Sequence, residues 1–317
     1  MKRNYTSLCA WTAVTFMVTA AMLGAEEKPS GGFGIGPGMV LVENIRPGDG
    51  EVDVNKSTGF SFEVENGTKE KHVFSVFVRP AKGMLSSWEM GYESVPDISW
   101  LRLDRTEVEV AANSRAKVSL FVKVPDKAEL YNRKFMAVVG CSPGKSEQNV
   151  SSVGLIVASR VQIETASNDE VDGLNAGSVG LVPSSWLMPD ARPGDSWRKV
   201  FKIRNNTKEE HSYSVKRIAD VEKDVSRHDR YYGQGCIKLD KESWVNIKDK
   251  DMSFTLKPNE VKELTVNVAV GKKALPQKRY EELLFLQDET GQIQFLRLRT
   301  ETVATTADAQ PNDQKAP

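Results

Sequence analysis

An internal repeat constrains the fold of this sequence more than any other feature. Two long segments align in order, and the offset between them stays between 139 and 146 residues. The sequence Arg-Pro-Gly-Asp at residues 46–49 recurs at 192–195. Further along the chain, Trp100 is matched by Trp244. Several matches that keep their order over such a length indicate a duplicated domain.

The matched segments have the pattern of β-strands. Residues 60–64 read Phe-Ser-Phe-Glu-Val, and the aligned residues 200–204 read Val-Phe-Lys-Ile-Arg. Alternation of apolar and polar side chains places one face of a strand in a core and the other in water. Pro-Gly and Asn-Gly separate the segments and favour turns, and the Pro-Gly pairs suit type II turns. We therefore predict an all-β fold of two tandem immunoglobulin-like β-sandwiches, each of roughly seven strands.

The composition along the chain suggests where these domains begin and end. Residues 30–38 are rich in glycine, residues 167–177 are small and acidic, and the last residues are polar. Such stretches cannot bury enough apolar surface to order themselves. The predicted organisation is a signal peptide at 1–25, a flexible leader at 26–38, a first sandwich at 39–166, a linker at 167–177, a second sandwich at 178–304 and a disordered tail at 305–317.

The N-terminus predicts export. Lys2 and Arg3 are basic, residues 8–23 are mostly apolar and uncharged, and Gly24 and Ala25 are small. This is the pattern of a cleavable secretory signal peptide, with cleavage expected after Ala25. We expect the mature chain to be periplasmic, or else secreted or at the cell surface. No later stretch is apolar enough to span a bilayer, so no transmembrane segment is expected in the mature chain.

Charge and cysteine content narrow the classes of partner. Without Lys2 and Arg3, the chain has 41 basic and 43 acidic residues. A chain with so little net charge does not have the basic surface that nucleic acid binding needs, so nucleic acid is excluded as a partner.

The mature chain keeps Cys141 and Cys236, one in each predicted domain. Either they form a disulfide that clamps the two sandwiches together, or they are free buried thiols.

The sequence carries no recognisable catalytic or metal-binding motif. It has three histidines and none of the spacings typical of zinc hydrolases, serine hydrolases or phosphate-binding loops. His72 and His211 occupy equivalent repeat positions, which favours a structural role, and His228 in a charged segment is expected to be exposed. We predict that the protein is not an enzyme and has no catalytic residue, no metal site and no cofactor.

Two aromatic inserts are the candidate binding segments. Residues 80–99 and 219–235 break the alternating pattern at corresponding places in the two repeats. Aromatic side chains on long loops of a rigid sandwich often contact partners. Alternatively, each insert folds back on its own domain. Trp100 and Trp244, which begin equivalent strands, are predicted to be core residues. The predicted binding residues are Trp88, Tyr92, Tyr231 and Tyr232.

The repeated order of Pro-Gly turn, alternating strand, Asn-x-Thr turn, alternating strand and tryptophan strand resembles a known group of domains. It is similar to the immunoglobulin-like domains of bacterial extracytoplasmic proteins. These include the surface-protein domains associated with peptidoglycan binding and, more distantly, pilus-chaperone-like sandwiches. The resemblance covers residues 39–165 and 178–303. Cys141 and Cys236 are not at equivalent repeat positions, so the sheet-bridging disulfide of antibody domains is absent.

Two functions fit these observations. The first is an exported, non-catalytic binding or scaffolding protein of the cell envelope, which contacts a protein or an envelope polymer through loops or sandwich edges. The alternative is a periplasmic chaperone-like protein that binds subunits in the groove between its domains. The resemblance implies an arginine and a lysine in that groove, and this pair has no assigned counterpart in the sequence. An apolar contact between the domains and a cationic cleft would favour the chaperone, and an extended pair of domains would favour the scaffold.

Overall fold

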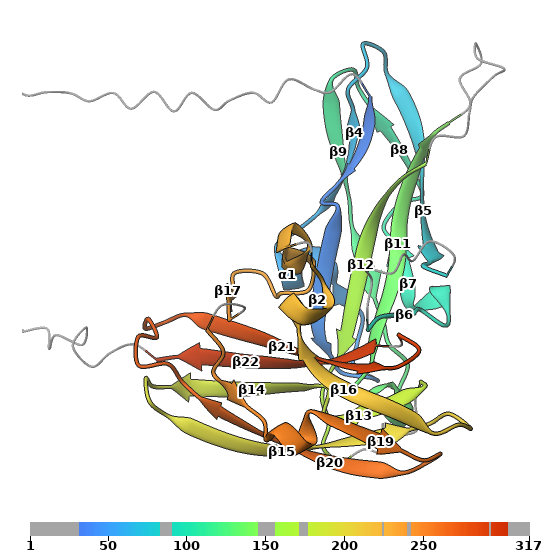
Figure 1. Ribbon diagram of the computed structural model, residues 1–317. Coiled ribbons are helices and arrows are strands. Elements are labelled where there is room, and N and C mark those ends of the chain that lie inside the picture. The colour runs from blue at the N-terminus through green and yellow to red at the C-terminus, as the bar shows by residue number, and fades with distance from the viewer. Residues whose placement is uncertain are drawn as a thin grey trace, which may run out of the picture.

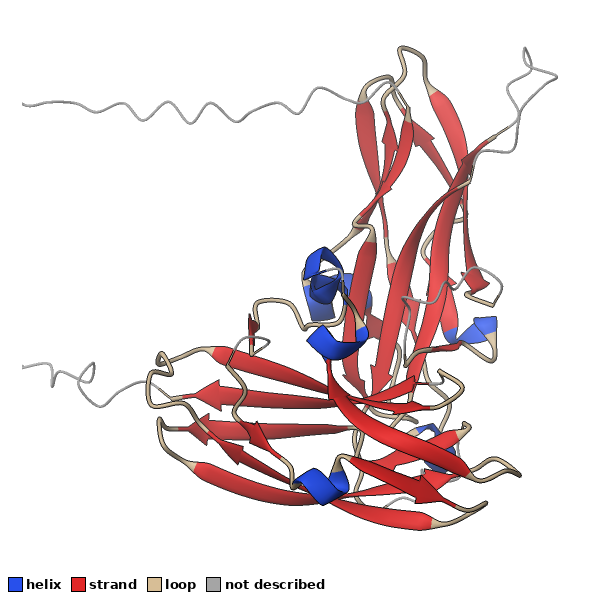
Figure 2. Cartoon of the chain, viewed as in Figure 1, coloured by secondary structure: helices blue, strands red, loops and turns tan. Residues whose placement is uncertain are grey.

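Two β-sandwiches make up the molecule, and they meet at an angle like the two arms of an elbow (Figure 1). The computed structural model describes residues 32–82, 91–144, 156–170, 177–223, 225–239, 242–291 and 293–303. The predicted signal peptide and tail lie outside these residues. Nearly all regular structure is strand, and the few helices are short (Figure 2). In the described part of the chain, no helix combines the length and apolar character needed to cross a bilayer.

In the first sandwich, one large sheet lies opposite two small ones. The large sheet has the order β2-β12-β11-β5-β8, with β6 added beside β11, and the small sheets are β1-β4-β9 and β3-β10-β7. Its strands are β1 Phe33–Gly36, β2 Met39–Ile45, β3 Val52–Asp53, β4 Phe62–Asn66, β5 His72–Pro80, β6 Glu93–Ser94, β7 Leu101–Leu103, β8 Glu107–Val110, β9 Ser114–Val118, β10 Leu120–Val122, β11 Lys134–Pro143 and β12 Val157–Thr165. Its short helices are α1 Val54–Thr58, η1 Ile98–Trp100 and η2 Ala128–Leu130.

The second sandwich repeats this plan. Its sheets have the orders β14-β22-β21-β16-β19, with β17 beside β21, and β13-β15-β20-β18. Its strands are β13 Val179–Val182, β14 Ser185–Ala191, β15 Ser196–Asn205, β16 His211–Arg217, β17 Ile237–Lys238, β18 Val245–Asn246, β19 Ser253–Leu256, β20 Val261–Ala269, β21 Arg279–Asp288 and β22 Ile293–Thr302. Its short helices are α2 Ile218–Val221, η4 Val225–Arg230 and η5 Asp249–Asp251.

The duplication extends to irregular backbone. In each domain the first long strand runs parallel to the last one, β2 beside β12 and β14 beside β22, and the register shifts near its end. The residues at the shift, Asn44 and Asp190, both have positive φ, 56° and 54°. The following turns hold Gly48 at φ 87° and Gly194 at φ 90°, as a type II turn requires of its third residue. The predicted two-sandwich fold is confirmed.

A buried asparagine holds the second repeated turn. Asn66 is fully buried, and its Nδ2 donates to the backbone oxygens of Glu70 and Val110 at 2.8 and 3.0 Å. Its Oδ1 accepts from the backbone N–H and the hydroxyl of Thr68. Asn205 makes the equivalent bonds in the second domain. The Asn-x-Thr motif is therefore a structural element of the repeat, because it satisfies backbone groups that would otherwise be buried without partners.

Replacing Asn66 with alanine is expected to lower the free energy of unfolding by about 2 kcal/mol, since several buried backbone oxygens lose their donor. Urea denaturation followed by tryptophan fluorescence measures the change. Lys69→Ala in the same turn is the control, because Lys69 is exposed. Equal unfolding midpoints for the two variants would contradict the assigned role of Asn66.

Each sandwich has its own apolar core, and the predicted tryptophans belong to these cores. Trp100 packs edge-on against Phe135 with ring centroids 5.2 Å apart, and Trp244 lies 4.5 Å from Tyr280. Both tryptophans are 7% exposed, which agrees with the prediction. Cys141 and Cys236 are free thiols, so the structure shows the unbridged alternative.

Several expectations from the sequence are wrong. The glycine-rich stretch expected to be part of a flexible leader supplies β1, which pairs with β4 because Phe33 packs against the rings of His72 and Phe74. His228 is predicted to be exposed, but it is buried, with 2% of its surface exposed. Its Nε2 lies 2.8 Å from the backbone oxygen of Glu222. Strand β14 was not predicted, because Pro189 and Asp190 interrupt its alternation.

Candidate functional site: the elbow between the domains

An apolar cluster joins the two sandwiches, and Phe295 of β22 lies at its centre. Tyr92 of the first domain and Tyr231 of the second place their ring centroids 5.6 and 6.5 Å from that of Phe295. Phe285 of β21 lies 5.5 Å away. We call this group the elbow core: Ala81, Tyr92, Met136 and Val138 of the first domain, and Ile218, Tyr231, Tyr232, Leu283, Phe285 and Phe295 of the second. The elbow core is smaller than the core of either sandwich, but its members are equally buried, so packing holds the two domains together.

A network of buried charges lies beside the elbow core. Arg297 of β22 is 3% exposed and donates to both carboxylate oxygens of Glu164, from Nε at 2.9 Å and from Nη2 at 2.6 Å. Its Nη1 lies 2.8 Å from Oε1 of Glu281. Tyr92 also donates its hydroxyl to Glu164, at 2.6 Å. Since Glu164 lies next to the last residue of β12 in the first domain, its bidentate ion pair with Arg297 ties one sandwich to the other.

A second arginine extends this network toward solvent. Arg299, two residues further along β22, donates to both oxygens of Glu43 at 3.2 and 2.6 Å and to Glu281 at 2.7 Å. Glu43 comes from β2 of the first domain, so this is a second charged link between the domains. The side chain of Glu43 is 28% exposed, whereas that of Glu281 is fully buried. The other oxygen of Glu281 accepts from the backbone N–H of Gly233 at 2.6 Å.

Lys134 completes the network from the first domain. It is 4% exposed, and its Nζ donates to the backbone oxygen of Phe295 at 2.8 Å. The ammonium group also lies over the ring of Phe295, 4.4 Å from the centroid, where a cation is attracted to the face of the ring. The three cations of the network, Lys134, Arg297 and Arg299, face the three carboxylates of Glu43, Glu164 and Glu281.

Burial and charge shift the pKa values in this network. Burial by itself raises the pKa of Glu164, but the charges of Arg297 and Lys134 and the hydrogen bonds from Arg297 and Tyr92 outweigh it and lower the pKa to about 2. Burial lowers the pKa of Lys134 to about 8, against the opposing charge of Glu164. At neutral pH Glu164 is therefore ionised, and Lys134 is mostly protonated.

Acid is expected to destabilise the protein through Glu164. Its carboxylate, with a pKa lowered to about 2 from 4.5, stabilises the folded protein above pH 4.5, and this contribution is lost as the pH falls toward 2. The shift corresponds to roughly 3 kcal/mol. Melting temperatures measured between pH 7 and pH 2.5 should therefore fall less steeply for Glu164→Gln than for the wild type. The exposed substitution Glu107→Gln should follow the wild type, and a Glu164→Gln curve parallel to that of the wild type would contradict the argument.

The start of the predicted linker is held in place. Ser167 Oγ lies 2.6 Å from Ser185 Oγ, and Lys199 pairs with Asp169 at 2.8 Å. Asn132 Oδ1 accepts from the backbone N–H groups of both Asn168 and Ser184. These bonds tie the first described residues after β12 to both sandwiches. The expected flexible connection is therefore wrong for residues 167–169.

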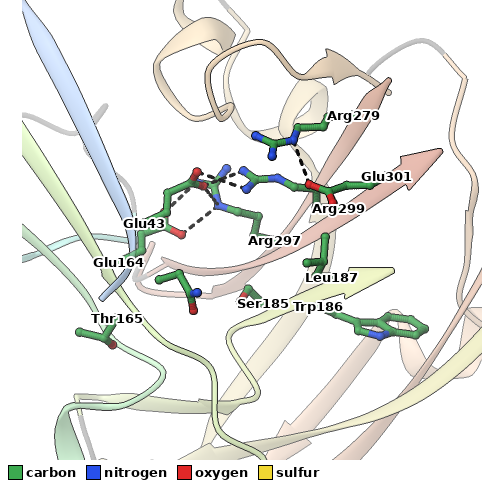
Figure 3. A pocket seen from close by; sticks show the side chains of 11 residues that line it. Glu43, Glu164, Thr165, Ser185, Trp186, Leu187, Arg279, Arg297, Arg299 and Glu301 are labelled. Atoms are coloured by element: carbon green, nitrogen blue, oxygen red, sulfur yellow. Dashed lines mark hydrogen bonds and ion pairs between the residues drawn. The ribbon is translucent and has the colours of Figure 1, made fainter. Parts of the chain in front are cut away.

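A pocket opens beside the charge network, with walls from both domains (Figure 3). Its volume is about 280 Å³. Glu43 and Asn44 of β2 form the wall of the first domain, together with Glu164 and Thr165 of β12. The second domain contributes Ser185, Trp186, Leu187, Arg279, Arg297, Arg299 and Glu301. We call this site the elbow pocket.

Two strands at the edges of their sheets line the elbow pocket. β2 and β14 are each outermost in their sheets. The backbone N–H of Arg297 donates to the backbone oxygen of Ser184. In a parallel pair of strands, alternate residues bond to the neighbouring strand, so the even-numbered residues of β14 bond to β22. The backbone N–H and C=O of Leu187 therefore point away from β22. Leu187 is 51% exposed. The pocket thus offers backbone hydrogen bonds beside an apolar side chain.

The charges of the elbow pocket are largely satisfied within the protein. Arg297 and Arg299 hold carboxylates of this chain, and Arg279 pairs with Glu301 at 2.9 Å. A cleft lined by arginines is present, but carboxylates balance them. The arrangement can bind an extended peptide through backbone and apolar contacts. The described residues do not bring three metal-ligating side chains together.

The structure places the predicted binding residues away from the surface. Tyr92, Tyr231 and Tyr232 are 7%, 1% and 6% exposed, so the expectation of aromatic side chains displayed on loops is wrong for all three. Residues of both inserts join the elbow core, where Tyr92 and Tyr231 pack on Phe295, and this packing buries the rings. Trp88 lies outside the described residues. A role of the four residues in binding a partner stays a prediction.

The charge network was not predicted from the sequence. Arg297 and Arg299 alternate with apolar residues in β22, in phase with Phe295. That phase places them on the face of the sheet opposite the core of the second sandwich. The available signal was a pair of arginines in phase with an apolar aromatic residue, although it does not identify the carboxylates of β2 and β12 as partners.

No known family model matches the sequence, and no curated protein matches it. Solved structures are similar to it. A protein of unknown function from Porphyromonas gingivalis W83 has 12% identity and a TM-score of 0.33, over 85% of this chain and 99% of that chain. The periplasmic chaperone SfaE has 7% identity and a TM-score of 0.29, over 86% and 100%. The E. coli chaperone DraB has 9% identity and a TM-score of 0.30, over 85% and 98%.

Proposed function

We propose that this protein is an exported, non-catalytic binding protein that holds an extended segment of a partner protein in the elbow pocket, as a periplasmic chaperone would. The observation that carries the proposal is the pocket itself, which has walls from both domains. A site built this way exists only while the two sandwiches keep their relative position. The elbow core and the charge network provide that constraint.

Strand addition is the mode of binding that the elbow pocket fits best. An extended peptide can pair with an exposed sheet edge through its backbone, while alternate side chains enter neighbouring pockets. The edge of β14 offers the N–H and C=O of Leu187, beside the side chains of Trp186 and Leu187. Pro189, which has no N–H, ends this edge. The available edge is therefore short, and it lies inside the pocket.

The scaffold alternative needs two sandwiches that move independently on a flexible linker. Tyr92 packs on Phe295, Glu164 binds Arg297, and Ser167 contacts Ser185. The first two contacts cross between the domains, and the third ties the start of the linker to the second domain. They favour the chaperone-like alternative, although the satisfied charges argue against a cleft that attracts its ligand mainly through free cations.

Site-specific crosslinking tests the proposal. Leu187 is replaced by the photoreactive residue benzoylphenylalanine, and the purified protein is irradiated in envelope extract of the cells that export it. A discrete protein adduct is expected. Val200, which is 40% exposed on β15 and does not line the pocket, carries the same label as the control. No adduct at position 187, or the same adduct from both positions, would contradict the proposal.

A further inference from the structure

The insert at residues 219–235 brings its backbone against the guanidinium group of Arg299, and the residue at this contact is the buried Gly233. A Cβ atom on Gly233 would lie 2.3 Å from Nη2 of Arg299 and 3.3 Å from its Cζ. Non-bonded heavy atoms pack best at about 3.5–4.0 Å. No side chain therefore fits at position 233 while Arg299 stays in place.

The atom nearest to this missing side chain is the one that bridges the two domains. Nη2 of Arg299 donates to Oε1 of Glu43 at 2.6 Å and to Oε1 of Glu281 at 2.7 Å. Glu43 belongs to β2 of the first domain, and Glu281 belongs to β21 of the second. Since Glu43 and Arg299 line opposite walls of the elbow pocket, this single nitrogen connects the two walls.

The backbone of Gly233 is anchored on both sides. Its N–H donates to Oε2 of Glu281 at 2.6 Å, and its C=O accepts from the backbone N–H of Cys236 at 3.2 Å. Tyr231 and Tyr232, which precede it directly, are buried in the elbow core. The segment is therefore not free to retreat from an added side chain, and the end of the Arg299 side chain is the part that moves.

The backbone conformation does not explain the glycine at this position. Gly235, two residues later, has a φ of 73°, in the left-handed region that favours glycine. Gly233 has no positive φ. The close approach to Arg299 is the feature of the structure that requires a glycine at position 233.

We infer that Gly233 is a positioning residue of the elbow pocket, because the space left by its absent side chain holds Nη2 of Arg299 between Glu43 and Glu281. A side chain at position 233 displaces the guanidinium from Glu43 first. Glu43 is 28% exposed and can be solvated, whereas Glu281 is fully buried and also pairs with Arg297. The walls of the pocket then separate. The effect on partner binding rests on the proposed function, and the effect on the position of the domains does not.

The distance between the domains in Gly233→Ala tests the inference. Spin labels are placed at Lys69→Cys and Lys208→Cys, on exposed turns of the two domains, in the full-length protein with Cys141→Ala and Cys236→Ala. Double electron–electron resonance is expected to give a broader distribution of distances for Gly233→Ala than for the same labelled protein with glycine at 233.

Two further variants separate the contact with Arg299 from a general effect of the substitution. Gly50→Ala should leave the distribution unchanged, because Gly50 is exposed and a Cβ there has no neighbour within 4 Å. Where Arg299→Ala has already removed the guanidinium, Gly233→Ala should add no broadening, since two changes that remove one shared contact are not additive. If Gly233→Ala alone fails to fold by circular dichroism, Arg299→Ala should restore folding. An unchanged distribution for Gly233→Ala, equal added broadening without Arg299, or a double variant as unfolded as the single one would overturn the inference.

Photocrosslinking at position 187 distinguishes this inference from the proposed function. Gly233→Ala should lose most of the adduct that forms with glycine at 233. Absence of an adduct even with glycine at 233 would contradict the proposed function, and the distance measurement would still decide the role of Gly233. A full yield of adduct in Gly233→Ala would overturn its role in positioning the pocket.

Discussion

Replacing Arg297 with methionine is expected to lower the free energy of unfolding by about 3–5 kcal/mol, because the substitution leaves buried carboxylates without their counter-charge. Glu164 and Glu281 both lose a partner, and both are buried. Removing one member of a buried ion pair lowers the stability of the folded protein by more than the intact pair adds to it, since the remaining charge is neither solvated nor neutralised. Guanidinium denaturation at pH 7, followed by circular dichroism, measures the change.

Arg279→Met is the matched control. Arg279 also belongs to the elbow pocket, but its pair with Glu301 is exposed, and such pairs contribute about 0–1 kcal/mol. The double variant Arg297→Met with Glu164→Gln should recover part of the stability lost in Arg297→Met, because it removes one stranded charge. Equal stability of Arg297→Met and Arg279→Met would contradict the account of the charge network.

Phe295→Ala is expected to destabilise the protein by about 3–5 kcal/mol and to separate the motions of the two sandwiches. Phe295 is fully buried at the centre of the elbow core, and rings from both domains pack on it. The substitution leaves a cavity between the domains, whereas the core of each sandwich keeps its own residues. Differential scanning calorimetry should therefore show two separate transitions in place of one.

Phe60→Ala is the control for this cavity. Phe60 is 36% exposed, so its truncation removes the same atoms from a site that contributes less to packing. A small loss of stability and a single transition are expected. A single cooperative transition for Phe295→Ala at the wild-type temperature would show that the elbow core does not couple the domains.

The fold could be predicted from the sequence because its signals are local and occur twice. The alternating residues at 200–204 predicted a strand that lies within β15, and the matched turns predicted the positive φ of Gly48 and Gly194. Strand β14 was missed because an edge strand with an exposed leucine and a proline has no clear alternation. Strand β1 was not predicted, because its glycine content favours a flexible segment, although Phe33 and Ile35 alternate with glycine within it.

The elbow could not be predicted in the same way, because its contacts join positions that no local pattern connects. Glu43 and Glu164 meet Arg299 and Arg297 across more than a hundred residues of sequence. The aromatic inserts were correctly singled out as unusual. Their interpretation as exposed contacts was wrong because a long aromatic loop can equally fill the boundary between two domains. Only the relative position of the sandwiches distinguishes these outcomes.

The central claim is that the two sandwiches form one rigid elbow, and a distance distribution between them tests it most directly. Spin labels are placed at Lys69→Cys and Lys208→Cys, which are exposed and occupy equivalent turns of the two domains, in a protein with Cys141→Ala and Cys236→Ala. Double electron–electron resonance in frozen solution should give one narrow distance. A broad distribution like that of two domains on a free linker would contradict the account.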